Sequence, residues 1–258
     1  MKYFIAFITA VILCTGAQAE IRAKAVQYRH GNTVLEGYLA YDDSIQGKRP
    51  GVLVVHEWWG LNSFTMKRTE ELARLGYIAF AVDMYGEGIR ASDPQKASQL
   101  AGVYLNDRTL MRDRAMAGLD ILLHHPLVDP QKIAATGYCF GGTTVLELAR
   151  GHAPVLGVVS FHGGLSTPTP AETKNVTAKV LVLHGADDPF TTKDQINTFM
   201  DEMRNSGADW QMIFYGGAVH SFTNPQADSF GIKGIAYNEK ADRRSWQAMR
   251  QFLDELFK

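Results

Sequence analysis

Residues 137–142 read Gly-Tyr-Cys-Phe-Gly-Gly, and this run separates a predicted strand at residues 133–136 from a predicted helix at residues 143–150. Gly-x-Cys-x-Gly between a strand and a helix is the pattern of a nucleophile elbow, with the sulfur of Cys139 in place of a serine oxygen. The turn is sharp, so we expect a side chain at Gly137 or Gly141 to clash with neighbouring backbone. The elbow would place Cys139 at the top of the sheet and at a helix N-terminus, where the macrodipole favours a thiolate.

A lone cysteine in an apolar segment is often only a buried small side chain, so the residues downstream have to decide its role. A predicted strand at residues 178–184 ends in Gly-Ala-Asp-Asp-Pro at residues 185–189. We expect Asp188 to be an orienting acid, with Asp187 as the alternative.

A further predicted strand at residues 212–215 runs into a glycine-rich loop that holds His220. The order Cys139, Asp188, His220 is therefore nucleophile, acid and base, the order of the α/β-hydrolase triad. Such a set predicts acyl transfer, in which the imidazole handles the thiol proton and the carboxylate fixes the imidazole tautomer.

A fourth predicted strand end lies at residues 51–60, which read Gly-Val-Leu-Val-Val-His-Glu-Trp-Trp-Gly. We expect an oxyanion hole here, formed by the backbone N–H groups of Phe140 and Trp58. The pair His56-Glu57 invites a zinc-protease interpretation, but Gly60 stands where the second histidine of His-Glu-x-x-His belongs. We therefore expect no metal.

These motifs together resemble the dienelactone hydrolase family. The matching segments are His-Glu-Trp-Trp-Gly at 56–60, Asp-Met-Tyr-Gly at 83–86, the elbow at 137–142, His-Gly-Ala-Asp-Asp-Pro at 184–189 and His-Ser-Phe at 220–222. The resemblance covers nearly the whole chain from about residue 23. It implies catalysis without a cofactor, and it gives Glu57 the role of contacting the resting thiol and helping to activate it.

The chain departs from the family at two positions. In the family one arginine lies two residues after the tyrosine that matches Tyr85, another lies four residues after the catalytic histidine, and both hold the substrate carboxylate. Here these positions are Glu87 and Asn224, which cannot make the bidentate contact of arginine. We therefore expect anionic dienelactone to be a poorer substrate than neutral esters, although Arg90 is close enough in sequence to compensate.

The first nineteen residues have the features of a secretory signal peptide. A short positive start and an apolar run precede Ala-Gln-Ala at residues 17–19, a typical cleavage site. We expect an exported protein, with the periplasm as its compartment and one domain over residues 20–258. Cleavage would remove Cys14 and leave Cys139 as the only thiol, so no disulfide could form within the chain.

The near balance of positive and negative charges limits the classes of binding partner. The chain has 26 Lys and Arg residues against 27 Asp and Glu residues, which argues against a nucleic-acid surface and a stable membrane anchor. The expected partner is a small-molecule ester or lactone, and the sequence does not predict an oligomeric state.

The order of predicted elements indicates an α/β-hydrolase fold. Two runs at residues 23–28 and 34–41 read as an antiparallel hairpin at a sheet edge. Strands and helices then alternate, with a long polar-then-helical region at about 94–123. This order predicts a mostly parallel central sheet with helices on both faces.

Aromatic residues near the motifs predict the wall of a substrate pocket. Trp59, Tyr85, Phe190 and Phe222 would gather above the elbow if the loops meet at the carboxyl edge of the sheet. Each one taken alone is more simply explained by core packing. His162 also ends a predicted strand, but it precedes the acid, so we expect a structural role.

The sequence therefore predicts a hydrolase that cleaves an ester, lactone or thioester through an acyl-cysteine intermediate. Two alternatives are a non-catalytic small-molecule-binding protein on the same fold and a thiol redox sensor.

Overall fold

The computed structural model describes residues 20–168, 170 and 173–258, so the predicted signal peptide at 1–19 lies outside the described residues. Eight strands occur in the described part of the chain: β1 (Ile21–His30), β2 (Thr33–Asp42), β3 (Arg49–Val55), β4 (Ile78–Val82), β5 (Val128–Tyr138), β6 (Gly157–Phe161), β7 (Lys179–Gly185) and β8 (Trp210–Tyr215). The helices there are α1 (Ser63–Arg74), α2 (Pro94–Leu105), α3 (Arg108–Leu123), α4 (Phe140–Arg150), α5 (Lys193–Ser206), the short η2 (Ala227–Phe230) and α6 (Glu239–Leu256). None of these helices has the length and apolar character needed to cross a bilayer.

The strands form one sheet in the order β1-β2-β4-β3-β5-β6-β7-β8. β2 pairs antiparallel with β1 and with β4, and the remaining neighbours are parallel. The predicted edge hairpin and the mostly parallel sheet are therefore confirmed, and the fold is that of an α/β-hydrolase. Gly31 turns the hairpin with φ of +56°, a conformation that costs glycine little.

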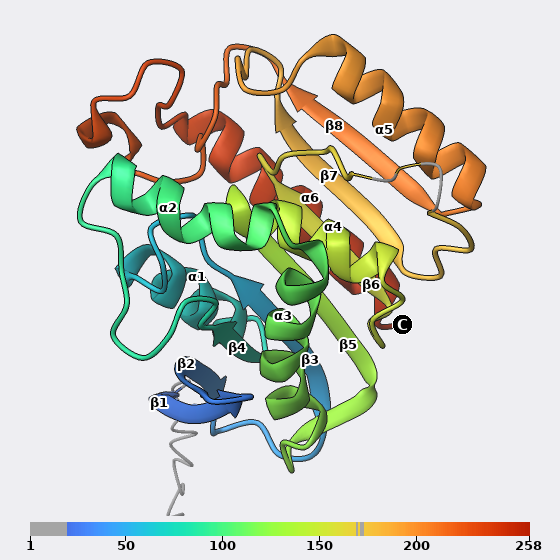
Figure 1. Ribbon diagram of the computed structural model, residues 1–258. Coiled ribbons are helices and arrows are strands. Elements are labelled where there is room, and N and C mark those ends of the chain that lie inside the picture. The colour runs from blue at the N-terminus through green and yellow to red at the C-terminus, as the bar shows by residue number, and fades with distance from the viewer. Residues whose placement is uncertain (1–19, 169, 171–172) are drawn as a thin grey trace, which may run out of the picture.

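Alternate residues of the central strands face two separate apolar cores, which is why these strands read as continuous hydrophobic runs. In β3, Leu53 and Val55 enter one core and Val52 and Val54 enter the other, all with no exposed surface. The first core receives side chains from α2, α3, α4 and α5, and the second from α1 and α6. Figure 1 shows this sandwich, with α3 and α4 in front of the sheet and α6 behind it.

The helical region expected at 94–123 is broken into two helices. Asn106 ends α2, and the Asp107 side chain begins α3 by accepting a hydrogen bond from the backbone N–H of Leu110 at 2.9 Å. The first backbone N–H groups of a helix have no acceptor within the helix, and an aspartate at the N-cap accepts from one of them. Asp107 therefore favours the start of a new helix over continuation of α2. Consequently α2 crosses above the sheet edge while α3 runs back along the face (Figure 1).

Candidate active site

The elbow after β5 has the strained geometry that its sequence predicts. Cys139 adopts φ of 54° and ψ of −113° and is the N-cap residue of α4. A Cβ on Gly137 would lie 2.1 Å from the carbonyl oxygen of Gly141, and a Cβ on Gly141 would lie 2.2 Å from that of Val55. Both predicted clashes are confirmed, so only glycine lets the turn close this tightly.

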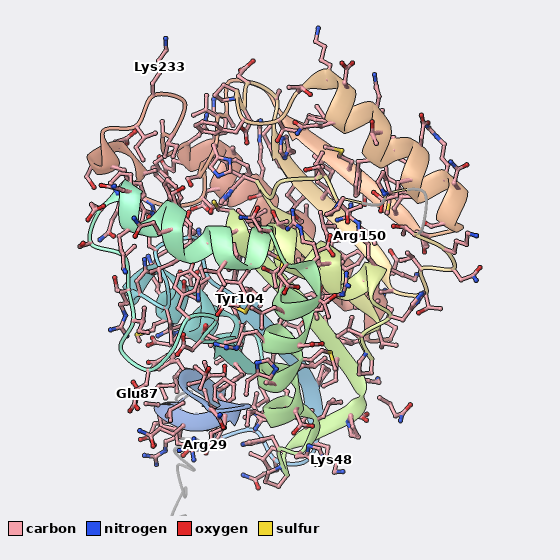
Figure 2. The ribbon with its side chains drawn as sticks, in the orientation of Figure 1. Arg29, Lys48, Glu87, Tyr104, Arg150 and Lys233 are labelled. Carbon is pink, nitrogen blue, oxygen red and sulfur yellow. The ribbon has the colours of Figure 1, made fainter. Side chains whose placement is uncertain are left out.

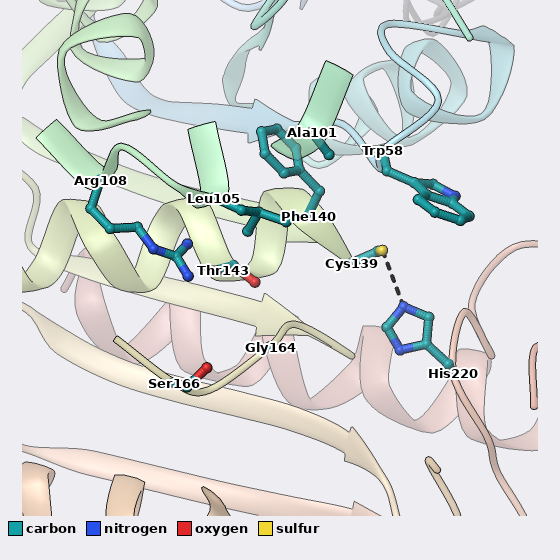
Figure 3. A pocket seen from close by; sticks show the side chains of 10 residues that line it. All are labelled: Trp58, Ala101, Leu105, Arg108, Cys139, Phe140, Thr143, Gly164, Ser166 and His220. Carbon is teal, nitrogen blue, oxygen red and sulfur yellow. Dashed lines mark hydrogen bonds between the residues drawn. The ribbon is translucent and has the colours of Figure 1, made fainter. Parts of the chain in front are cut away.

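Three side chains from three strand ends meet at the carboxyl edge of the sheet. The Cys139 sulfur lies 3.1 Å from Nε2 of His220, and Nδ1 of His220 lies 2.8 Å from Oδ2 of Asp188. Figure 3 shows the thiol and the imidazole facing each other among the side chains that line a cavity. This spacing allows a proton to pass between sulfur and imidazole while the carboxylate orients the ring.

The two candidate acids lie in different surroundings. The Asp188 side chain is fully buried, and its Oδ1 accepts the backbone N–H of Phe190 at 2.9 Å. Asp187 is exposed, and its carboxylate accepts the backbone N–H of Gly217 at 2.8 Å. Only Asp188 is in contact with the His220 ring, so the geometry selects it over Asp187 as the partner of the imidazole.

The electrostatics favour a charged imidazole. Burial alone would lower the pKa of His220, but the nearby Cys139 sulfur and the hydrogen bond to Asp188 outweigh it and raise that pKa to about 10. Burial likewise acts to raise the pKa of Asp188, but the hydrogen bond and charge of His220 overcome it and lower that pKa. His220 is therefore held as an imidazolium beside the Cys139 sulfur.

Two further histidines lie beneath these side chains and stay neutral. The backbone N–H of Cys139 donates to Nδ1 of His162 at 3.1 Å, and Nε2 of His162 lies 2.8 Å from the hydroxyl of Thr223. Burial holds the pKa of His162 well below its usual value and lowers that of His184 to about 4. His162 thus supports the elbow from below, in the structural role expected for it.

Glu57 is buried next to this assembly but is held by other partners than the thiol. Its two oxygens accept the hydroxyl of Ser221 at 3.0 Å and the side-chain amide of Asn224 at 2.6 Å. No hydrogen bond joins Glu57 to Cys139 in the described part of the chain. The Cys139 thiol is hydrogen-bonded to His220 instead. The contact with the resting thiol implied by the resemblance is therefore absent. Burial raises the pKa of Glu57, and the two hydrogen bonds only partly offset this.

The two predicted oxyanion-hole amides have no acceptor among the described residues. Phe140 is the first residue of α4, so its N–H has no acceptor within the helix. The Trp58 N–H has no hydrogen-bond acceptor among the described residues. The Tyr85 hydroxyl donates to the Trp58 carbonyl oxygen at 3.0 Å and so anchors that loop.

A cavity of about 310 Å³ opens beside Cys139. The residues that line it are Trp58, Ala101, Leu105, Arg108, Cys139, Phe140, Thr143, Gly164, Ser166 and His220. No group of three or more His, Cys, Asp or Glu side chains in the described part of the chain is arranged to hold a metal ion.

None of the four aromatic residues predicted for the pocket wall lines this cavity. Phe222 is fully buried below the site, with its ring 5.1 Å from that of His162. Tyr85 is buried against the Trp58 loop, and Trp59 lines a separate cavity of about 400 Å³. Phe190 is 52 % exposed and packs edge-on against His220 at 5.3 Å. The expectation is corrected because Phe222 and Tyr85 pack in the core, while Trp59 and Phe190 lie on surfaces outside this cavity.

The cavity wall comes instead from segments whose sequence carried no motif. Leu105 and Arg108 flank the break between α2 and α3, and Gly164 and Ser166 belong to the loop after β6. The helix cap at Asp107 is the one sequence signal that indicates this break.

The positions that differ from the family pattern also lie away from the cavity lining. Glu87 is exposed at the margin beside β1, where its carboxylate accepts the Gln27 side chain at 2.5 Å (Figure 2). The side-chain amide of Asn224 donates a hydrogen bond to Glu57. Arg90 lines the cavity that contains Trp59. Neither Glu87 nor Asn224 therefore lines the cavity beside Cys139.

A mostly parallel sheet with an elbow cysteine, an acid and a histidine at its carboxyl edge is typical of an α/β-hydrolase. The chain belongs to the dienelactone hydrolase family, whose profile matches residues 35–257. It is a hydrolase of the class that acts on ester and lactone bonds.

Individual relatives agree with this assignment. Protein usf of Aquifex pyrophilus is 30% identical over 208 residues, which cover 79% of this chain and 88% of that protein. A crystal structure of a dienelactone hydrolase-like promiscuous phosphotriesterase from metagenomic libraries is 43% identical, covers 93% of this chain and 100% of its own, and superposes with a TM-score of 0.88. A second structure, m3DLH, is 42% identical over 92% of this chain and 99% of its own, with a TM-score of 0.89.

Proposed function

We propose that this chain hydrolyses esters, lactones or thioesters through an acyl-Cys139 intermediate. The observation that carries the proposal is the continuous contact from the Cys139 sulfur to His220 at 3.1 Å and from His220 to Asp188 at 2.8 Å. Cys139 and His220 also line a cavity. The family's name adds support, because it denotes lactone hydrolysis.

The chemistry follows from the positions of these groups. The thiolate attacks the carbonyl carbon, and the N–H groups of Phe140 and Trp58 stabilise the resulting oxyanion. His220 gives its proton to the leaving oxygen as the acyl–oxygen bond breaks, which leaves the acyl group on sulfur. Neutral His220 then takes a proton from water, the hydroxide attacks the thioester, and the thiolate and imidazolium are restored as the acid leaves.

The structure gives less support to a redox sensor or to a non-catalytic binding protein. A redox sensor with an internal resolving thiol would need a second cysteine, and residues 20–258 contain only Cys139. A pure binding protein would have no need for a strained cysteine in contact with a buried imidazole–carboxylate pair.

The experiment is a substrate panel with the wild type and with Cys139→Ala. The panel contains short-chain aryl esters, lactones, acyl thioesters and one aryl phosphotriester, since a similar protein is named for the last activity. Turnover in Cys139→Ala should fall to background with an unchanged circular dichroism spectrum and melting temperature. A fully active Cys139→Ala would refute the acyl-cysteine mechanism.

We also propose that the chain is exported and cleaved after Ala19. Support comes from the residue pattern at 1–19. N-terminal sequencing of protein recovered from a periplasmic extract should read from Glu20, and recovery of the uncleaved chain from the cytosolic fraction would contradict the proposal.

A further inference from the structure

We propose that the cavity between the end of β8 and the start of α6 binds a phosphate group. This cavity of about 120 Å³ is lined by Tyr215, Gly216, Asn238, Lys240, Ala241 and Arg244. It shares no lining residue with the catalytic cavity, so the proposed site is separate from the chemistry at Cys139. The proposal therefore does not rest on the acyl-cysteine mechanism.

Two cations on one face of α6 line the cavity without acidic partners. Lys240 and Arg244 are four residues apart, so they lie on the same face of the helix, where like charges repel each other. Both are exposed, and neither forms an ion pair with a carboxylate in the described part of the chain. Asp242, the acid between them in the sequence, lies 2.5 Å from Arg68 instead. The protein therefore leaves the positive charge at this cavity without a counter-ion.

The Tyr215 side chain adds a buried donor that has no partner. Tyr215 is 8 % exposed, and its hydroxyl forms no hydrogen bond within the described structure. Burial raises the pKa of Tyr215 to about 12, and the positive charge of Arg244 partly opposes this, so the phenol and the guanidinium lie close together. The hydroxyl keeps its proton at neutral pH and can donate it to an oxyanion. Because buried polar groups normally have partners, this hydroxyl at a cavity wall indicates a ligand.

The start of α6 supplies a backbone donor at the same place. Asn238 caps the helix by accepting the N–H of Ala241 at 3.1 Å, but the N–H of Lys240 has no acceptor among the described residues. The N-terminus of this 18-residue helix also carries a positive partial charge. Free N–H groups and a positive dipole end together favour a phosphate.

The set of donors favours a tetrahedral dianion over a carboxylate. Lys240 and Arg244 offer two full positive charges, which match the charge of a phosphate at neutral pH. The Tyr215 hydroxyl comes from β8 and the Lys240 N–H from α6, so the donors approach from two elements. Inorganic phosphate and the phosphate group of a monoester present this same chemistry.

The proposed site adjoins the loop that carries His220. Gly216 follows β8 directly, and the Asn238 side-chain amide donates to the carbonyl oxygen of Gly217 at 3.1 Å. A phosphate held between Gly216 and α6 would join the two ends of the segment 216–238. We therefore expect it to stabilise the segment that holds His220.

Calorimetric titration with inorganic phosphate and with methyl phosphate, at an ionic strength held constant with chloride, tests the proposal. Lys240→Gln and Arg244→Gln should each raise Kd by roughly tenfold, the usual effect of losing a charged hydrogen bond. Tyr215→Phe should raise it by about 2- to 10-fold with an unchanged melting temperature, and Arg244→Lys should restore part of the affinity. Tighter binding of inorganic phosphate would identify the free ion as ligand, and tighter binding of methyl phosphate a phosphate monoester.

Two control arginines locate the ligand. Arg243→Gln removes the same charge from an exposed position of α6 outside the cavity lining, and Arg108→Gln removes it from the catalytic cavity. Each should change Kd by less than about threefold.

Hydrogen exchange gives a readout that a change in net charge alone would not move. Phosphate should slow amide exchange in residues 216–222 of the wild type, and it should not do so in the double variant Lys240→Gln, Arg244→Gln.

The proposal would be overturned if the wild type bound no phosphate, or if Lys240→Gln and Arg244→Gln kept the wild-type Kd. An equal rise of Kd in Arg243→Gln, or loss of binding in Arg108→Gln, would overturn it as well. Failure of the acyl-cysteine mechanism would leave all these measurements unchanged, because none of them depends on turnover.

Discussion

Replacing Asp188 by asparagine should disable the site through the tautomer of His220. The Asp188 Oδ1 accepts the backbone N–H of Phe190 at 2.9 Å, so the oxygen of an introduced asparagine would remain there. Its NH₂ would then occupy the position of Oδ2, 2.8 Å from Nδ1 of His220, where it can only donate. The ring would have to carry its proton on Nε2, pointing at the Cys139 sulfur, and could no longer accept the thiol proton.

The size of the loss follows from this mismatch. In a serine triad the same change costs about 10⁴-fold in kcat through the wrong tautomer. A cysteine is partly ionised without its base, which lessens the loss. We therefore expect a fall of roughly 10²- to 10⁴-fold in kcat for Asp188→Asn. The carboxylate also helps to raise the pKa of His220 to about 10, so Asp188→Asn should lower that pKa.

The assay pairs Asp188→Asn with Asp187→Asn and Asp188→Ala. Asp187 is exposed and an asparagine there keeps an oxygen for the Gly217 N–H, so Asp187→Asn should retain activity within about threefold. Asp188→Ala removes the wrong donor and should be no worse than Asp188→Asn. Turnover of an aryl ester gives kcat, and NMR titration of the His220 ring gives its pKa. Equal, small losses in both asparagine variants would refute the tautomer argument.

Two further changes probe the groups around the sulfur. Burial raises the pKa of Glu57, so the stability that this group contributes is present below its unfolded pKa and is lost as pH rises through the folded value. Glu57→Gln should therefore raise the melting temperature at pH 7, by about 2–4 °C for each kcal/mol gained in the free energy of unfolding. The increase should be smaller at pH 4. A lower melting temperature of Glu57→Gln at pH 7 would contradict this prediction. Tyr85→Phe removes the 3.0 Å hydrogen bond to the Trp58 carbonyl oxygen and should lower kcat up to about tenfold with little change in fold; an unchanged kcat would show that the loop needs no such anchor.

The parts of the molecule that sequence predicts well depend on local spacing. The elbow needs glycine at 137 and 141 because a Cβ there would lie 2.1 to 2.2 Å from a backbone carbonyl oxygen. The six-residue motif at 137–142 is enough to predict this constraint. The acid and the histidine follow strand ends, and parallel strands bring their carboxyl ends together whatever the intervening sequence. The hairpin, the sheet and the positions of Cys139, Asp188 and His220 follow from these two rules.

The cavity wall could not be predicted because it depends on how distant segments pack. Phe222 and Trp59 stand next to motif residues in the sequence, yet one ring fills the core and the other faces a second cavity. Glu87 illustrates the same point, since a position taken from the family pattern lies at the exposed margin of this chain. Conversely, Arg108 lies in a region that reads as uninterrupted helix, and only the cap at Asp107 brings it to the site.

In the proposed mechanism, catalysis and selectivity are carried by different parts of the fold. Cys139, Asp188 and His220 are fixed by strand ends and by buried partners, so a change near them alters the reaction for every substrate. The junction of α2 and α3, by contrast, supplies Leu105 and Arg108 without touching the sulfur–imidazole–carboxylate contacts. Because the exposed end of a helix tolerates substitution far better than a buried elbow, we expect the substrate range of this hydrolase to change most readily at Leu105 and Arg108, while the proposed chemistry at Cys139 stays the same.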